Sequence, residues 1–328
     1  MKAHFLFGSL LAMASLVSAS ACSSSSGGDG GASPDSGTSI AKDTGGAPLD
    51  TSTTPEVSSA DDCKEDPADI PAGSICIHDV TGKVTDTSGA PLGNLVVSVC
   101  GGVCYFAKTA ADGTFNAHPG SHMVPDRFAV LVHGRPDKAS VYSKLPKTTA
   151  EGSIALPKPI MTVGYDKTGP ALPADGAGGT VTAGDVTIKA PSGTAFDLDV
   201  EDVANGDAGR LFRSTKWTAS TPPDFAVGGN VLALYALAPF ATRTCAVTPC
   251  TDTNLIKVAV TVANTTGLPA GTAVEFVVMG TNLFSKPPNA GVLVVEATGT
   301  VSADGATITT DAGQGLTDLS WLGIRKKS

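Results

Sequence analysis

The sequence predicts an all-β protein. From Asp79 onward, short segments in which apolar and polar residues alternate are separated by turn-forming residues. The 328 residues include 38 Gly and 22 Pro, while only 16% are charged and 41% are hydrophobic. No stretch of the region that follows Asp79 has a sustained helical period. These features are typical of a turn-rich β protein whose core is large enough to fold on its own.

Residues 1–21 predict an export signal rather than part of the fold. A short polar start precedes an apolar run over residues 5–17, and small residues fill positions 18–21. The apolar run is shorter than the roughly 20 residues that a membrane-spanning helix needs. A buried core helix is the alternative, but no cap and no amphipathic face supports it. Ordinary and lipoprotein signal peptidases would both cut before Cys22.

Residues 19–22, Ala-Ser-Ala-Cys, resemble the lipobox of bacterial lipoproteins, although Ala19 stands where that family usually has Leu. The resemblance implies that Cys22 is acylated, with palmitate as the typical lipid, and becomes the first residue of the mature protein. The chain has seven cysteines, and acylation of Cys22 leaves an even six. Ser23 resembles the residue found in outer-membrane lipoproteins. We therefore expect a lasting lipid anchor in the outer membrane, facing the periplasm or the cell surface.

Residues 22–62 predict a disordered tether. They are mainly Ser, Gly, Thr, Asp and Pro, with almost no large apolar side chain. Such a segment cannot bury enough surface to offset the entropy lost on ordering. A flexible chain of this length has a mean reach of roughly 35 Å, which would hold the folded part clear of the lipid headgroups.

Residues 63–163 predict a first β-sandwich. Alternation or β-branched residues indicate strands at 80–85, 95–99, 105–109 and 127–132. Asp112-Gly113, between two such segments, is typical of a hairpin turn.

A motif in this region resembles the carboxypeptidase regulatory-like domain, a small prealbumin-like β-sandwich. Gly89 permits a turn, Pro91 fixes φ after it, and Phe115 is expected to point into the sandwich. The resemblance covers about residues 77–163, and it implies an accessory module without catalytic residues. It is carried by Gly82–Asp86, Ser88–Leu92, Asn94, Val96–Val99, Thr109, Asp112–Phe115 and the returning segment Phe128–Gly134. The Cys100–Cys104 insert departs from the family pattern.

Residues 164–328 predict a second β-sandwich-like region, for which the sequence suggests no family. Asn230–Pro239 is apolar on both faces and fits either a central strand or a short helix. Val292–Val295 indicates a buried strand, and Asp304-Gly305 another hairpin turn. Further alternating segments are Val181–Ile188, Leu255–Val262 and Ala273–Met279.

The six remaining cysteines are disulfide candidates. Among the fifteen possible pairings, the simplest joins neighbours: Cys63 with Cys76, Cys100 with Cys104, and Cys245 with Cys250. The chain-entropy model gives about 3 kcal/mol for the first clasp and about 2 kcal/mol for each tight loop. A zinc site built from the last four cysteines is the alternative, but an oxidising compartment favours disulfides.

Other metal candidates are weak, and we expect no cofactor. His118 and His122 have a spacing that would aim both rings at one ion on a helix, but Pro119 and Gly120 break such a helix, so an exposed loop is expected. An acidic patch offers oxygens suited to Ca²⁺, without the spacing of an EF-hand. Its candidate ligands are Asp197, Asp199 and Asp202.

Composition and motifs favour a non-enzymatic binding or structural module. The net charge of −9 argues against a nucleic-acid partner. No nucleophile elbow, P-loop or dinucleotide fingerprint is present, and two Trp and four Tyr give little support for a glycan platform. The membrane is the expected partner through the lipid, and a protein or glycan partner is not identified. The alternatives are a hydrolase with its catalytic part in residues 164–328, or an accessory subunit of an outer-membrane assembly.

Overall fold

The computed structural model describes residues 62–101, 103–134, 136–166, 168–281 and 290–328. Strands make up 45% of the structure and helices 6%, so the predicted all-β class is confirmed. The described residues hold one α-helix, α1 (Val200–Ala204). They also hold three short 3-10 helices, which are η1 (Pro125–Arg127), η2 (Gly206–Arg210) and η3 (Asp224–Ala226).

The predicted signal peptide, the acylation site Cys22 and the tether as far as residue 61 lie outside the described residues. Those features remain predictions. Within the described ranges, no helix is both long enough and apolar enough to cross a membrane.

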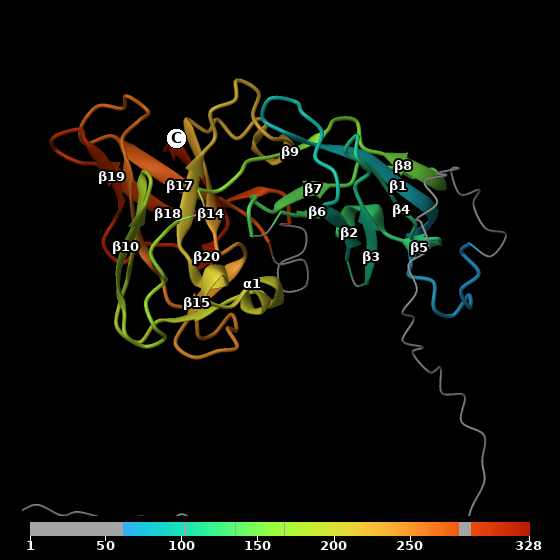
Figure 1. Cartoon of the computed structure of the whole chain (residues 1–328), viewed down its shortest axis with the longest axis horizontal. Helices are drawn as coiled ribbons and strands as arrows, with labels where there is room; N and C mark the ends of the chain where they lie inside the picture. Colours follow the sequence, from blue (N-terminus) through green and yellow to red (C-terminus); the bar gives the residue numbers. More distant parts are fainter. Residues whose placement is uncertain (1–61, 102, 135, 167, 282–289) are drawn as a thin grey trace, which may run out of the picture. The chain divides into compact units, whose positions relative to one another are not determined.

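Two sheets build the first half of the described fold (Figure 1). One is centred on β1 (Ile75–Asp86), and its other strands are β4 (Thr114–Ala117), β5 (Ser121–Met123), β8 (Gly152–Ala155) and β9 (Ile160–Thr162). The second, in spatial order, consists of β3 (Cys104–Lys108), β2 (Val96–Cys100), β6 (Ala129–His133) and β7 (Val141–Lys144). Val84 from the first sheet and Val97 from the second are buried in one shared core. The two sheets therefore pack as a β-sandwich.

β1 is longer than the predicted strand at 80–85. The sequence pattern missed the first part of the strand, because the buried residues of β1 do not keep a period of two. Val80 and Val84 are buried, but so is Ile77, three residues before Val80. The pairing of β1 with β8 shifts register between Ile77 and Val80, and such an irregularity changes which residues face inward. β1 is antiparallel to β4 and β5 and parallel to β8 and β9.

Asp112-Gly113 forms a tight turn, but the expected hairpin between paired strands is wrong. The Gly113 N–H donates to the Ala110 carbonyl at 2.9 Å, and the Ala110 N–H donates to the Thr114 carbonyl at 2.7 Å. β3, before the turn, pairs with β2, whereas β4, after it, pairs with β1. The chain therefore crosses from one sheet to the other here, because the residue pair specifies the turn and not the partners of the flanking strands.

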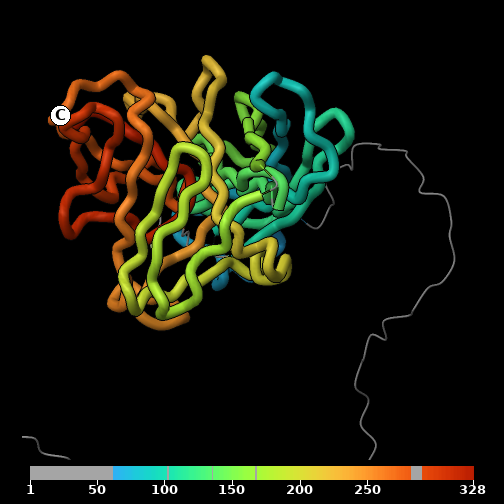
Figure 2. The backbone as a smooth tube through the Cα atoms, turned by 60° about the vertical axis from the view of Figure 1, so that its left-hand side comes forward, coloured from blue at the N-terminus to red at the C-terminus, as the bar shows by residue number. Residues whose placement is uncertain are grey.

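A nine-stranded antiparallel sheet dominates the second half, and its edge hairpin β10–β11 is the yellow-green hairpin in Figure 2. In spatial order its strands are β10 (Gly179–Ala183), β11 (Val186–Ala190), β16 (Ala259–Ala263), β19 (Thr307–Thr310), β18 (Leu293–Val301), β17 (Ala273–Met279), β21 (Trp321–Lys326), β14 (Ala233–Ala238) and β13 (Arg213–Lys216). A three-stranded sheet contains β12 (Ala195–Asp197), β15 (Thr242–Cys245) and β20 (Asp318–Leu319). Buried side chains from both sheets form a second core.

Local predictions for this half had mixed outcomes. Val181–Ile188 is not a single strand but parts of β10 and β11 with a turn between them. Asn230–Pro239 contains β14, whose six residues are all buried between neighbouring strands. Val292–Val295 is not a buried strand, since Val295 is 45% exposed. The Asp304-Gly305 hairpin is confirmed, because it joins the paired strands β18 and β19.

Trp321 links the two halves of the fold. Its side chain is fully buried, and its ring lies 5.8 Å from that of Trp217 and 5.2 Å from that of Phe225, measured between centroids. Its Nε1–H donates to the carbonyl of Ser140, just before β7, at 2.9 Å. The described residues belong to one compact unit. The domain boundary between residues 163 and 164 remains a prediction.

All six cysteines of the described residues are paired as neighbours, as predicted. The Cα–Cα distances are 5.7 Å for Cys63–Cys76, 4.1 Å for Cys100–Cys104 and 5.5 Å for Cys245–Cys250. The alternative zinc site of four cysteines is contradicted, because its sulfurs are bonded in two separate disulfides.

Candidate functional site

Titratable side chains gather around the first disulfide, and we refer to them as the N-terminal cluster. Cys63 holds the segment that precedes β1, through its bond to Cys76 and through its N–H, which donates to the Gly120 carbonyl at 2.7 Å. The cluster consists of Asp62, Cys63, Glu65, Cys76, His78, His118 and His122. These residues come from three separate stretches of sequence, so the fold and not the local sequence assembles the cluster.

Two histidines share the carboxylate of Asp62. His78 Nδ1 lies 2.7 Å from one Asp62 oxygen, and His118 Nε2 lies 3.1 Å from the other. The Asp62 side chain is only 5% exposed. The other ring nitrogen of His118 lies 3.1 Å from Asp79. Asp62 thus ties the segment before β1 to β1 itself and to the end of β4.

The Glu65 carboxylate is hydrogen-bonded to both the backbone and the ring of His122. The His122 N–H donates to Glu65 Oε1 at 2.7 Å, and His122 Nδ1 lies 2.8 Å from Glu65 Oε2. His122 lies on β5, where it is paired with Cys76 of β1, and this register places its ring near the disulfide. The prediction of an exposed loop is therefore wrong for His122, because the sheet recruits residues 121–123 as a strand.

The surroundings in the cluster shift the pKa values of Glu65 and His118. Burial raises the pKa of Glu65, but the hydrogen bonds from the His122 ring and backbone outweigh this and hold that pKa below its ordinary 4.5. The hydrogen bond to Asp79 raises the pKa of His118 above its ordinary 6.5; desolvation opposes this, and Asp62 adds to it. At mildly acidic pH, both groups therefore favour their charged, paired forms.

We expect the segment before β1 to be held most firmly between pH 4.5 and 6.5. The stabilisation from Glu65 is present above its unfolded pKa and is lost as pH falls through its lower folded value, whereas that from His118 is present below its unfolded pKa and is lost as pH rises through its higher folded value. Each contribution should be below about 1 kcal/mol, since solvent screens these pairs. Hydrogen exchange of residues 62–71, corrected for intrinsic rates, should be slowest in that window. His118→Asn should abolish only the alkaline loss, and equal protection from pH 4 to 8 would contradict the assignment.

An apolar pocket of about 460 Å³ adjoins the cluster. Its polar lining residues are Glu65, Asp69, Ser121, His122 and Arg127, and the Tyr105 hydroxyl is hydrogen-bonded to Ser121. The apolar lining residues are Ile70, Pro71, Val103, Tyr105, Met123, Val124 and Phe128. Apolar walls with a few convergent polar groups are typical of small-ligand sites.

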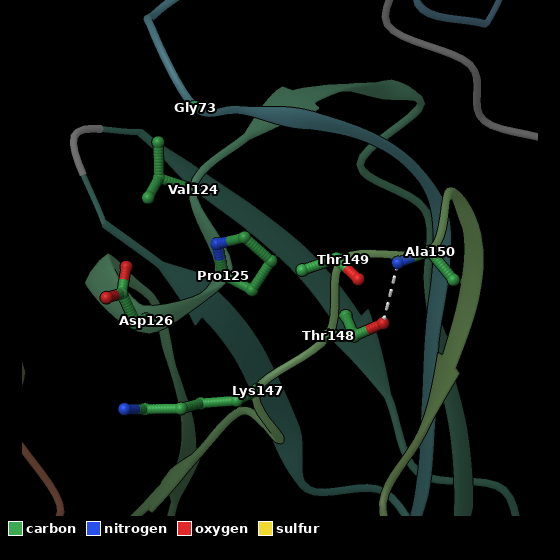
Figure 3. Close-up of a pocket in the computed structure, with 8 residues that line it drawn as sticks. All are labelled: Gly73, Val124, Pro125, Asp126, Lys147, Thr148, Thr149 and Ala150. Atoms are coloured by element: carbon green, nitrogen blue, oxygen red, sulfur yellow. Dashed lines mark hydrogen bonds between the residues drawn. The ribbon is translucent and has the colours of Figure 1, made fainter.

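A second, more polar pocket of about 560 Å³ also borders η1 (Figure 3). Figure 3 shows Thr148, Thr149 and Ala150 along one wall and Pro125 and Asp126 along the other. The Ala150 N–H donates to the Thr148 hydroxyl at 3.1 Å. Among the described residues, no aromatic side chain and no histidine lines this pocket, so the apolar pocket is the better candidate for a ligand site.

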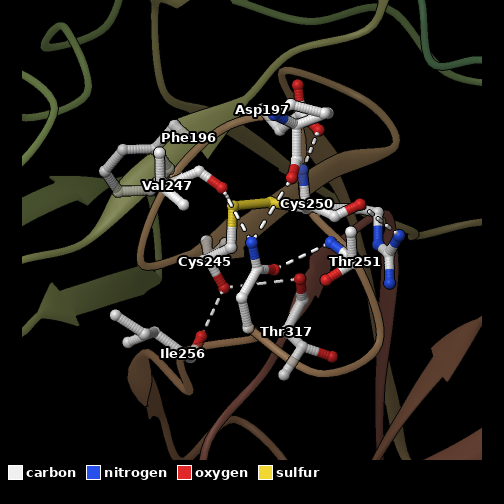
Figure 4. Close-up of a disulfide and its surroundings, with 12 residues drawn as sticks. Phe196, Asp197, Cys245, Val247, Cys250, Thr251, Ile256 and Thr317 are labelled. Carbon is white, nitrogen blue, oxygen red and sulfur yellow. Dashed lines mark hydrogen bonds between the residues drawn. A yellow bond between two sulfur atoms is a disulfide. The ribbon is translucent and has the colours of Figure 1, made fainter.

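The structure does not gather the acidic residues suggested as calcium ligands. Asp197 supports the third disulfide, where the Cys250 N–H donates to its carboxylate at 2.7 Å (Figure 4). Asp199 caps α1 by accepting from the Glu201 N–H at 3.1 Å, and Asp202 is buried. Among the described residues, the groups compact enough to share an ion do not include these three aspartates.

Ser98, His133 and Glu201 form a hydrogen-bonded chain that the sequence did not suggest. Ser98 Oγ lies 2.8 Å from His133 Nε2, and His133 Nδ1 is hydrogen-bonded to Glu201 of α1. The order resembles a serine nucleophile, its base and an orienting acid. Ser98 is fully buried, however, and it lies on β2, whose backbone is paired on both sides by β3 and β6. Because a nucleophile needs access and free oxyanion donors, this chain fastens α1 to the sandwich instead.

The sequence alone offers no partner for His78 or His133, because the carboxylates that they contact lie 16 and 68 positions away. One local signal was available for His78. Cys76 and His78 are two apart on a strand, which places both side chains on the same face. The spacing therefore indicated a histidine beside the first disulfide.

No protein-family model matches this chain, and neither do any curated protein or any solved structure.

Proposed function

We propose that this protein is a lipid-anchored, exported binding module whose ligand site is the apolar pocket beside the N-terminal cluster. The observation that carries the proposal is the pocket, where apolar walls meet Glu65, His122 and Arg127. Its chemistry suits a mainly apolar molecule that carries one polar or charged group. We place the ligand site near the tether, and the sandwich serves as its scaffold.

The pairing of the cysteines supports the proposal that the protein is exported. Six of the seven are bonded in short-range disulfides, and such bonds persist in oxidising compartments. The seventh is Cys22, the residue at which the lipobox-like sequence predicts acylation. An anchor in the outer membrane accounts for the remaining cysteine and for the polar segment that follows it.

The packing of the motif residues supports membership of the first sandwich in the carboxypeptidase regulatory-like family. Asp86 Oδ1 accepts from the Ser88 and Ala90 N–H groups at 2.8 and 3.0 Å, and Gly89 has a φ of +86° in the same turn. The Val84 N–H donates to the Gly113 carbonyl at 2.8 Å, so the second turn of the motif is hydrogen-bonded to β1 just before the first turn. Residues that the motif separates by up to thirty positions thus form one local structure.

Export and lipid anchoring are tested by intact mass spectrometry of native, non-reduced protein from membranes. We expect the loss of residues 1–21, added acyl mass on Cys22, and six hydrogens fewer than a fully reduced chain. Cys22→Ser should leave the disulfides intact but release the protein from the membrane fraction, because it removes the acylated sulfur. A protein that begins at an unmodified Met1 and has seven free thiols would contradict the proposal that it is exported.

The ligand site is tested with an anilinonaphthalenesulfonate probe, an aromatic anion that fluoresces in apolar pockets. Tyr105→Glu should reduce its binding at least about tenfold, because a carboxylate would occupy the apolar wall and repel the sulfonate of the probe. Phe106→Glu is the matched control: Phe106 is the next residue on β3, but it is 67% exposed and does not line the pocket. Equal binding by both variants and the parent would contradict the proposed ligand site, but it would not bear on export and lipid anchoring.

The hydrolase alternative finds little support in the pocket described for the second half. This pocket, of about 400 Å³, has Lys216, Ser220 and Asn230 among its polar lining residues, and no carboxylate or histidine is among the described residues that line it. General acid–base chemistry needs an acid and a base within hydrogen-bond reach. An accessory role in an outer-membrane assembly is separated from a free-standing module by pull-down from membranes through a tag.

A further inference from the structure

The first disulfide lies within a set of side chains that matches the donors of a metal site. The ligand atoms of Cys63, Cys76 and His78 lie within 4.8 Å of one another, and so do those of Cys63, Glu65 and His122. Cys63 belongs to both groups. In the oxidised protein the two sulfurs are bonded to each other, so the thiolate ligands exist only after reduction.

His78 already has the orientation of a metal-bound histidine. Its Nδ1 lies 2.7 Å from Asp62, and its Nε2 lies 3.8 Å from the sulfur of Cys76. In the neutral ring, donation from Nδ1–H to the carboxylate leaves the lone pair of Nε2 directed at the sulfur side. Histidines that bind metals almost always carry such a carboxylate on their other nitrogen. Asp62 is itself fixed by His118 at 3.1 Å, which restrains the ring further.

We propose that the N-terminal cluster is a redox-gated site for Zn²⁺, with Cys63, Cys76, His78 and Glu65 as ligands. A dithiol reductant would open the disulfide, becoming a disulfide itself and leaving two thiols on the protein. Zinc would then bind both sulfurs as thiolates, with release of their two protons. His122 donates to the second oxygen of Glu65, which is the outer support that a metal-bound carboxylate usually has.

For the two sulfurs and His78 the geometry requires only a small movement, whereas Glu65, which shares a group with Cys63 but not with Cys76 and His78, would have to move toward the ion. Zinc–sulfur bonds are about 2.3 Å long, so two sulfurs on one tetrahedral zinc lie about 3.8 Å apart. Side-chain rotation can supply this separation while the backbone stays in place, because the Cα atoms are 5.7 Å apart. The ion would take over the role of the disulfide and hold the segment before β1 in place under reducing conditions.

The test uses Co²⁺ as a spectroscopic probe on the full mature chain, reduced with a dithiol that is then removed without oxygen. We expect one Co²⁺ per chain, with the near-ultraviolet absorption of cobalt–thiolate bonds, displaced by Zn²⁺. The oxidised protein should give no such absorption. Asp62→Asn should weaken binding by about 10–100-fold, as expected for loss of an outer-shell partner, and far-UV circular dichroism would verify that this variant is folded.

Matched variants locate the ions. Replacing Cys63 and Cys76 with Ser should abolish the thiolate absorption, whereas the same change at Cys100 and Cys104 should leave it. His78→Ala should weaken Co²⁺ binding at least about tenfold, whereas His133→Ala, outside the cluster, should not. Absorption that depends on the other cysteine pairs, or no cobalt–thiolate absorption at all, would overturn the proposal. Pocket binding by the oxidised protein is measured separately, so failure here leaves the proposed function standing.

Discussion

Trp321→Ala is expected to lower the free energy of unfolding by about 3–5 kcal/mol, as is typical when a buried aromatic side chain is truncated. The substitution removes the ring that packs against Trp217 and Phe225, and it leaves a cavity between the two halves of the fold. It also leaves the Ser140 carbonyl without its indole donor. Chemical denaturation followed by far-UV circular dichroism would measure the change without relying on tryptophan fluorescence.

Two further variants separate packing from hydrogen bonding. Trp321→Phe keeps much of the apolar contact but removes the donor of this hydrogen bond, and the net contribution of such a bond is about 0.5–1.5 kcal/mol. Phe106→Ala, at a largely exposed ring, should change stability by less than about 0.5 kcal/mol. If Trp321→Ala were as mild as Phe106→Ala, the shared core would not couple the halves.

Local strand patterns were readable from the sequence, but strand partners were not. The predicted strand at 95–99 differs from β2 by one residue at each end, because alternation and β-branched residues report on local burial. The pairing of β1 with β8 and β9 joins residues about 75 positions apart. No local pattern encodes such a pairing, and Asp112-Gly113 was for the same reason assigned to the wrong strand pair.

The candidate site, like the fold, was predictable only in its local features. Cysteine spacing identified all three disulfides, because a short loop brings its ends together at small entropic cost. The carboxylate partners of the histidines could not be identified this way. His122 reaches the cluster only because β5 pairs with β1 in the register that places it opposite Cys76, and Glu65 reaches it through an irregular segment.

If the protein is anchored through its N-terminal segment as we propose, the first disulfide has a mechanical consequence. A pull on the chain before Asp62 is transmitted through Cys63 to Cys76 on β1. β1 pairs with four other strands, and force along it is shared among many backbone hydrogen bonds. The bond thus spares the segment between the two cysteines from carrying the load.

Replacing Cys63 and Cys76 with Ser in the oxidised protein is expected to lower the free energy of unfolding by about 3 kcal/mol, the chain-entropy value for a loop of this length. The local effect should be larger than the global one. Without the covalent bond, the segment before β1 is held by its pairs with His78, His118 and His122, and each such pair contributes about 0–1 kcal/mol. Urea unfolding would measure the global loss, and hydrogen exchange of residues 62–71 the local one.

The matched control replaces Cys245 and Cys250 with Ser. That shorter loop should cost about 2 kcal/mol, but exchange of residues 62–71 should be unchanged, because this disulfide begins on β15 in the second half of the fold. Should both double variants speed exchange of residues 62–71 equally, the segment would be held by global stability alone. Faster exchange in the Cys63/Cys76 variant alone would identify this bond as the one that holds the segment before β1, since among the disulfides of the described residues it is the one that joins this segment to β1.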